Sequence, residues 1–303
     1  MADDPSAILF PHLPPELERV IFKLAALARP KKIPILILAA RRVKEWVEPL
    51  LYRVVIVCFY SAAPAWKGCG FPIFTVDVLL RAIATKPAQF LQNSVRHLFL
   101  DAPVEPSELE AICEECNKVV NLFDCYTFAT VLDLGVFGAL SDLRFIALAL
   151  GDFLRCCNVK GTRSLLANIT HLELLDTMGN ERMEHLPVCL PLLPRLTHLA
   201  LTSISFGVPL KSALRDNENI QCILFLVSDS VVPQEPESPG VLAEDDRFVC
   251  VDQGAHWRQD WLRGADTGES YWALADAFIA ARRKGTVDRS RYRISTLDTS
   301  WRD

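Results

Sequence analysis

One arrangement of hydrophobic and polar positions, apolar-x-x-apolar-x-apolar, recurs through the middle of the chain. Its clearest copies are residues 169–174 (ITHLEL) and 196–201 (LTHLAL). Copies start at residues 95, 119, 143, 169, 196 and 220, so the intervals between them are 24, 24, 26, 27 and 24 residues. The copy at residue 119 is the weakest, because Asp124 occupies its last apolar position. Spacing this even indicates a structural repeat, and each copy predicts one short β-strand.

The segments between the copies have helical patterns. The segment that starts at Pro106 has Ser107 and Glu108 in its first turn, and these residues are typical of a helix N-terminus. A strand followed by a returning segment, repeated along the chain, builds a parallel sheet. We expect the first, fourth and sixth positions of each copy to point into one shared core, and the third and fifth to face outward. The predicted fold class is therefore α/β.

The period falls within the range of leucine-rich repeats, which are about 20–29 residues long. Those repeats carry Asn or Cys at their ninth position, whereas this chain has residues such as Pro103 and Thr177 there. We therefore expect an irregular leucine-rich-like solenoid without a ladder of asparagines.

The outward-facing third and fifth positions form a candidate surface for an unknown protein substrate. Strands in a sheet lie about 4.8 Å apart, so these side chains stand side by side. An apolar patch on a monomer indicates a partner or a covering segment. The predicted partner face comprises His97, Phe99, Phe123, Phe145, His171, Glu173, His198 and Cys222.

The same row contains residue types that bind zinc. His171, His198 and Cys222 occupy the third positions of three successive copies, and three such ligands are enough for a zinc site. A parallel row keeps its side chains side by side, however, and does not converge on one point. We therefore favour a recognition surface and predict no metal and no cofactor.

The N-terminal part of the chain has a different pattern, which predicts three helices. One apolar stripe at helical spacing follows two prolines: Leu17, Val20, Ile21, Leu24 and Ala28. This helix is expected to end at Pro30, a second to start near Pro34, and a third to run through residues 43–47 until Pro49 interrupts it. The β-branched run at 54–57 then predicts the first strand of the sheet.

The C-terminal part begins with an acidic, proline-rich loop at 231–246. A strand at 247–251 is expected to be the last of the sheet, and a capping helix is expected to run from Ser270 to Gly285. The predicted divisions of the chain are a flexible N-terminus (1–12), the helical segment (13–52), the solenoid (53–230), the loop (231–246), the last strand and capping helix (247–285), and a loose tail (286–303).

The N-terminal residues resemble the F-box signature in three places: Leu13-Pro14-x-Glu16-Leu17, Ile21-Phe22 and Lys44-x-Trp46. With the leucine-rich-like repeats, the chain resembles the F-box-like proteins that fungi carry in large numbers. The resemblance implies that a three-helix F-box docks on a Skp-type adaptor of a cullin ubiquitin ligase while the repeats capture a substrate. It assigns adaptor binding or the box core to Leu13, Pro14, Leu17, Ile21, Phe22 and Trp46.

The F-box pattern is incomplete in this chain. The apolar-Cys-basic run that usually precedes the tryptophan reads Arg42-Val43-Lys44, and the loop at 29–32 is basic. In the alternative interpretation, the three helices only cap the open end of a solenoid. The chain would then be a scaffold without a role in ubiquitin ligation.

Composition narrows the class of partner. The chain has 303 residues and a net charge of −5, so its surface lacks the positive charge needed for broad nucleic-acid binding. The longest stretch without a formal charge, 196–210, is 15 residues long and partly polar, which is too short to span a bilayer. The start of the sequence lacks the regions of a secretory signal. We therefore expect a cytoplasmic or nuclear protein that is monomeric outside its complex.

Candidate chemistry is sparse. The 10 cysteines are interpreted as reduced and mostly buried, including the C-x-x-C pair Cys113 and Cys116. The sequence contains no glycine-rich phosphate loop, no G-x-S-x-G and no H-E-x-x-H. The run from His256 to Trp261 places two tryptophans four residues apart, which predicts packing under the last strand. We therefore predict a protein that is not an enzyme.

Overall fold

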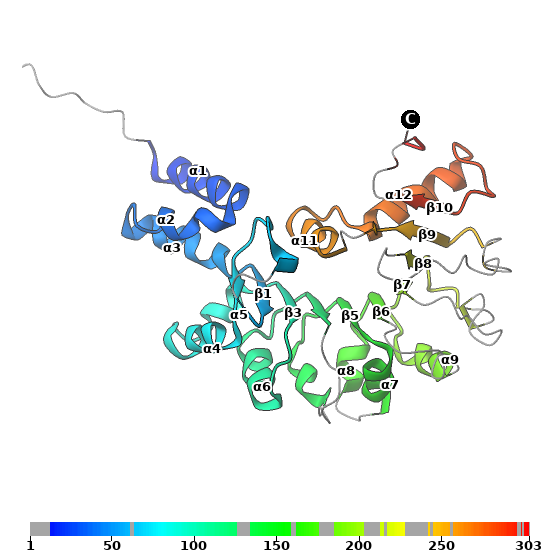
Figure 1. Cartoon of the computed structure of the whole chain (residues 1–303), viewed down its shortest axis with the longest axis horizontal. Helices are drawn as coiled ribbons and strands as arrows, with labels where there is room; N and C mark the ends of the chain where they lie inside the picture. The colour runs from blue at the N-terminus through cyan, green and yellow to red at the C-terminus, as the bar shows by residue number, and fades with distance from the viewer. Residues whose placement is uncertain are drawn as a thin grey trace, which may run out of the picture.

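A parallel sheet forms the centre of the molecule (Figure 1). The computed structural model describes residues 13–60, 64–125, 134–158, 162–175, 185–202, 213–214, 217–227, 242, 245–254, 257–295, 298 and 300–302. Within these residues, ten strands run in the order β10-β9-β8-β7-β6-β5-β4-β3-β1-β2. They are β1 Val54–Cys58, β2 Ile73–Phe74, β3 His97–Asp101, β4 Asn121–Asp124, β5 Phe145–Ala149, β6 His171–Leu175, β7 His198–Leu201, β8 Cys222–Val227, β9 Phe248–Asp252 and β10 Arg293–Ser295.

The repeat pattern predicts the pairing of strands correctly. The third positions of successive copies are direct partners in the sheet, from His97 opposite Asn121 to His198 opposite Cys222. Every described pair of strands is parallel. The expected α/β class and the parallel sheet are confirmed.

One face of the sheet is covered by the helices that connect the strands. The first, fourth and sixth positions of the copies point into this core, as predicted; Val95, Leu98 and Leu100 are typical. Figure 1 shows α4, α6, α7, α8 and α9 along this face. These connecting helices are α4 Val76–Thr85, α5 Phe90–Ser94, α6 Pro106–Glu115, α7 Leu150–Asn158, α8 Arg163–Leu166 and α9 Leu186–Cys189, with 3₁₀ turns η3 Leu134–Ala139 and η6 Leu190–Leu192. The 3₁₀ turn η2, Pro64–Trp66, lies on the other face, where Trp66 packs with Phe99.

The opposite face of the sheet is also covered, so the expectation that it is open is wrong. Helices α11 (Trp257–Thr267) and α12 (Tyr271–Lys284) pack against it. Phe99, at a fifth position, is completely buried, as is Leu224. A parallel sheet is usually buried on both faces, and here the C-terminal helices provide the second layer.

The N-terminal helices are α1 Pro15–Ala28, α2 Ile33–Leu36 and α3 Arg41–Leu51, with a 3₁₀ turn η1 at Pro30–Lys32. Helix α2 is a single turn, shorter than its apolar pattern predicts. Helix α3 continues through Pro49, because proline in the last turn removes only one hydrogen bond. Helix α3 also contacts α5, which joins the N-terminal helices to the rest of the fold.

The C-terminus adds a strand that the sequence did not indicate. Helix α12 ends as predicted, with Gly285 in the left-handed conformation at φ +79°. The chain then returns to the sheet as β10, which pairs with β9, and Trp301 is buried against α12. Strand β9 is therefore not the last strand, and residues 286–303 are not simply a loose tail. Residues 1–12 and most of the loop at 231–246 lie outside the described residues.

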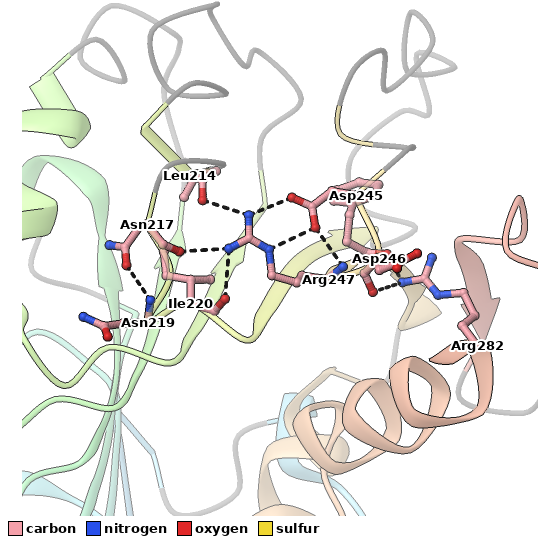
Figure 2. Close-up of polar contacts among 9 residues, drawn as sticks. Leu214, Asn217, Asn219, Ile220, Asp245, Asp246, Arg247 and Arg282 are labelled. Atoms are coloured by element: carbon pink, nitrogen blue, oxygen red, sulfur yellow. Dashed lines mark hydrogen bonds and ion pairs between the residues drawn. The ribbon is translucent and has the colours of Figure 1, made fainter. Parts of the chain in front are cut away.

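Arg247 joins three chain segments at the start of β9 (Figure 2). Its guanidinium donates to the backbone carbonyls of Leu214, Asn217 and Ile220 at 3.0, 2.8 and 3.1 Å. It also forms two bonds to the Asp245 carboxylate, at 3.0 and 2.8 Å. This single side chain therefore stabilises the segments that lead into two neighbouring strands, β8 and β9.

Replacing Arg247 with methionine should lower the free energy of unfolding by about 2 kcal/mol, because half-buried carbonyls lose their donors. Urea unfolding at neutral pH measures the change. The matched control is the same substitution at the exposed Arg289, which should change the free energy by no more than about 0.5 kcal/mol. Equal stability of the two variants would contradict the role assigned to Arg247.

Candidate functional site

The apolar stripe of α1 faces solvent. Leu17, Val20, Ile21 and Leu24 are 52%, 52%, 51% and 61% exposed, and Leu13, just before the helix, is 55% exposed. We refer to these five residues as the outer face of α1. The sequence pattern indicates an amphipathic helix, and such a stripe normally packs against the core. Its exposure is therefore the most unusual surface feature of the N-terminal helices.

The opposite side of α1 holds the helix in place. Ala26 is buried with Ile33, Val43 and Val47, and Phe22 packs against this cluster. Successive residues of a helix are about 100° apart, so Phe22 and Ala26 point away from the outer face. Helix α1 is thus fixed to α3 by one side while the other side stays free.

The residues assigned by the F-box resemblance divide into two groups. Leu13, Pro14, Leu17 and Ile21 are exposed. Phe22 and Trp46 are half-buried and pack within the cluster of the three helices. The first group has the accessibility that binding requires, and the second contributes to the internal packing of the segment.

The predicted partner face lies inside the molecule. Of its eight residues, Phe99, Phe123, Glu173, His198 and Cys222 are buried, and the other three are half-buried. The physical reason is the layer formed by α11 and α12, which covers the third and fifth positions. These residues therefore cannot capture a substrate in this conformation, and that prediction is wrong.

Aromatic rings fill the space between the sheet and α11. Phe99 and Phe123 are stacked, with their ring centroids 4.6 Å apart. Trp257 stacks on Phe123 at 5.3 Å, and Trp261 meets the edge of Phe99 at 5.0 Å. The two tryptophans therefore cover β3 and β4, not the last strand as predicted. His256 lies outside the described residues.

A cavity of about 120 Å³ remains between the sheet, α11 and α12. Glu173 lines it and accepts a hydrogen bond from the Tyr271 hydroxyl. Burial raises the pKa of Glu173 to about 7, and it lowers the pKa of His97 to about 4 and that of His171 to about 3. Burial thus favours the uncharged forms of these groups, as expected for an internal contact layer.

No family model matches the chain. The sequence also has no similar counterpart among curated proteins. Within the described residues, no helix combines the length and apolar character needed to cross a membrane.

The histidine row of the sheet forms a stack. His171 and His198 have their ring centroids 4.0 Å apart and their planes within 11°. His171, His198 and Cys222 do not converge on one point, as expected for a parallel row. Instead, Asp276 of α12 comes within 3.0 Å of Nε2 of His198. The ligand-type atoms of His198, Cys222 and Asp276 all lie within 4.8 Å of one another.

The C-x-x-C pair lies in the helix-covered core. Cys113 and Cys116 are both completely buried and unbonded to other cysteines. Burial raises the pKa of Cys116 to about 12 and that of Cys113 further. A thiol whose pKa is raised is a poor nucleophile, so the pair has the properties of packing residues.

Proposed function

We propose that this chain is a non-enzymatic protein-interaction protein, an F-box-type substrate receptor of a cullin-based ubiquitin ligase. In this proposal α1, α2 and α3 are an F-box-like segment that docks on a Skp-type adaptor. The parallel strands and their connecting helices are an irregular leucine-rich-like solenoid that carries this segment. The signature-like residues between Leu13 and Trp46 support the assignment.

The outer face of α1 carries the proposal. Helix α1 is already fixed to its neighbours through Phe22 and Ala26, and among the described residues its second apolar stripe is left about half exposed. An exposed apolar surface of this kind is typical of a binding site for another protein. The stripe includes Leu17 and Ile21, which the F-box resemblance assigns to adaptor binding or to the box core.

The apolar surface available for docking is comparable in size with what a complex requires. Burying four large apolar side chains contributes about 6–12 kcal/mol, and association of two proteins costs about 4–15 kcal/mol. The outer face of α1 has five such side chains, and Ile35 and Leu38 are also 61% and 82% exposed. Because these side chains are already partly buried, together they offer about as much free surface as four whole side chains, so the expected gain falls within the range of the association cost.

The alternative role, a cap for the solenoid, fits less well. A cap needs an apolar side toward the sheet and a polar side toward solvent. Helix α1 instead presents Leu17, Val20 and Leu24 to solvent. The strand residues covered by α11 and α12 are buried or half-buried and are not part of the proposed binding surface.

Replacing Leu17 or Ile21 with aspartate should weaken capture of a Skp-type adaptor by at least about tenfold, because each change removes one large apolar contact. The full-length chain is co-expressed with the adaptor, and complex formation is measured by co-purification and titration calorimetry. Circular dichroism should show unchanged folding, since both side chains are about half exposed.

The matched control is Val188→Asp, at an apolar residue of α9 that is 77% exposed. It should bind the adaptor as strongly as the unmodified chain. If the unmodified chain does not capture the adaptor, or if Val188→Asp weakens capture as much as Leu17→Asp, the proposal is wrong.

A further inference from the structure

We propose that His198, Cys222 and Asp276 form a binding site for a divalent transition metal ion of the zinc class, which links the sheet to α12. This site is separate from the proposed adaptor surface, and nothing in the proposed function requires it. Three protein donors with one position left for water is a common arrangement for zinc.

The fold brings the three side chains together from three elements. His198 begins β7 and Cys222 begins β8, and the two residues are direct partners in the parallel sheet. Both point to the face that α12 covers, where Cys222 packs in the cluster with Ala275 and Phe278. Asp276 follows Ala275 on α12, and its carboxylate lies 3.0 Å from Nε2 of His198.

Hydrogen bonds orient the imidazole of His198 for binding a cation. The Thr197 hydroxyl donates its one proton to the carbonyl of Thr170 at 3.2 Å. The 2.7 Å contact between this hydroxyl and Nδ1 of His198 then has Nδ1–H as its donor. We assign this tautomer from the hydrogen-bond pattern. It leaves the lone pair of Nε2 directed at the Asp276 carboxylate 3.0 Å away, so the position between these two acceptors can be filled by a proton or by a metal ion.

The donor set selects the class of ion. An imidazole nitrogen, a thiol sulfur and a carboxylate oxygen suit zinc and cobalt, whereas magnesium and calcium prefer oxygen ligands alone. Bond lengths of about 2.0–2.3 Å to zinc place tetrahedral donors about 3.3–3.6 Å apart. The donors here lie within 4.8 Å of one another, so small side-chain movements bring them to these distances.

The surroundings allow an ion to enter and exclude His171 as a ligand. The Asp276 side chain is 53% exposed, so an ion can reach the site from solvent and keep a water molecule as its fourth ligand. The ring of His171 is stacked parallel to that of His198, with the centroids 4.0 Å apart. The nitrogens of two stacked rings lie in parallel planes and do not converge on one ion. On binding, the Cys222 thiol releases its proton to solvent and the sulfur coordinates the metal as thiolate.

The test uses the full chain and cobalt(II), whose complexes with thiolate sulfur have a characteristic absorption band. The purified chain, freed of metal by a chelator, should develop this band with one cobalt per chain, and zinc should abolish it. Saturating zinc should also raise the melting temperature by about 5 °C. Asp276→Ala should weaken the affinity at least about tenfold, and Cys222→Ala should abolish the sulfur band.

Two matched controls distinguish this site from other histidines and cysteines. His171→Gln removes the neighbouring stacked histidine, and Cys250→Ala removes a buried cysteine of β9 that lies in the other core; both should keep the band. Since Asp276 is half exposed, its variant should fold normally. Absence of the band in the unmodified chain, or equal binding by Asp276→Ala, would overturn the proposal, leaving only a charged histidine–aspartate pair.

Discussion

Replacing Phe99 with alanine should lower the free energy of unfolding by about 3–5 kcal/mol, the usual effect of removing a phenylalanine from a core. Phe99 is completely buried. Its ring contacts Trp66 at 4.7 Å, Phe123 at 4.6 Å and Trp261 at 5.0 Å. The substitution leaves a space that these large rings cannot close without moving α11. Urea unfolding followed by tryptophan fluorescence measures the loss.

The matched control is Phe59→Ala, directly after β1, where the side chain is 54% exposed. This change should cost no more than about 0.5–1 kcal/mol. If Phe99→Ala were equally mild, α11 would not be packed on this face, and the sheet would be open as the repeat pattern first indicated.

The second large effect is a loss of stability as the pH rises through the pKa of Glu173. Burial raises this pKa from its ordinary value of 4.5 to about 7, and the nearby Asp260 carboxylate contributes in the same direction. Between these pH values the folded protein holds a proton that the unfolded chain has released. The protonated carboxyl group therefore contributes its full stabilisation below pH 4.5. As the pH rises from 4.5 to 7, the free energy of unfolding falls by about 1.4 kcal/mol per pH unit, a total loss of about 3 kcal/mol.

Glu173→Gln should remove this loss, because the amide stays uncharged and still accepts the hydrogen bond of Tyr271. The free energy of unfolding is measured by urea denaturation at pH 5 and at pH 8 for both proteins. The difference in the free energy of unfolding between the two proteins should change by about 2.5 kcal/mol from pH 5 to pH 8, in favour of the variant. Comparing the two proteins cancels the titration of His97 and His171, whose lowered pKa values give the opposite trend below pH 6.5. A difference that does not vary with pH would contradict the buried, protonated carboxyl group.

The sheet was predictable from the sequence because each strand and its place beside the next are specified by residues close together in the chain. A strand of alternating positions, such as 196–201, specifies its own two faces, and an even period places each copy beside the next. The alignment of His171 with His198 and Cys222 followed from that period alone. No contact beyond neighbouring copies was needed to predict it.

The covering layer was not predictable in the same way. The pattern at 271–284 predicts a helix with an apolar side, but the sequence of a helix does not specify which surface that side packs against. The apolar fifth positions Phe99 and Phe123 indicated either a partner or a covering segment, and periodicity does not distinguish these. Asp276 was missed as a neighbour of His198 for the same reason, since 78 residues separate them.

The exposure of the outer face of α1 was not predictable either, because this helix has two apolar sides and either could be the buried one. Its stripe of Leu17, Val20, Ile21 and Leu24 is the strongest apolar pattern in that helix, and such a pattern usually marks the buried side. The side that packs carries Phe22 and Ala26, which fit against α3, and Glu18, which accepts two hydrogen bonds from Arg42 of α3. Which of two apolar sides is buried depends on the neighbouring helix, and so on contacts that a single sequence does not contain.

The short strands at both edges of the sheet limit pairing between the sheets of two molecules. Strand β2 has only two residues and β10 only three, so each margin has few unpaired backbone groups to offer to a second sheet. Without β10, the apolar five-residue strand β9 would form that margin and would act as a template for intermolecular pairing. Strand β10 therefore occupies the edge of β9 at which a second molecule would otherwise pair.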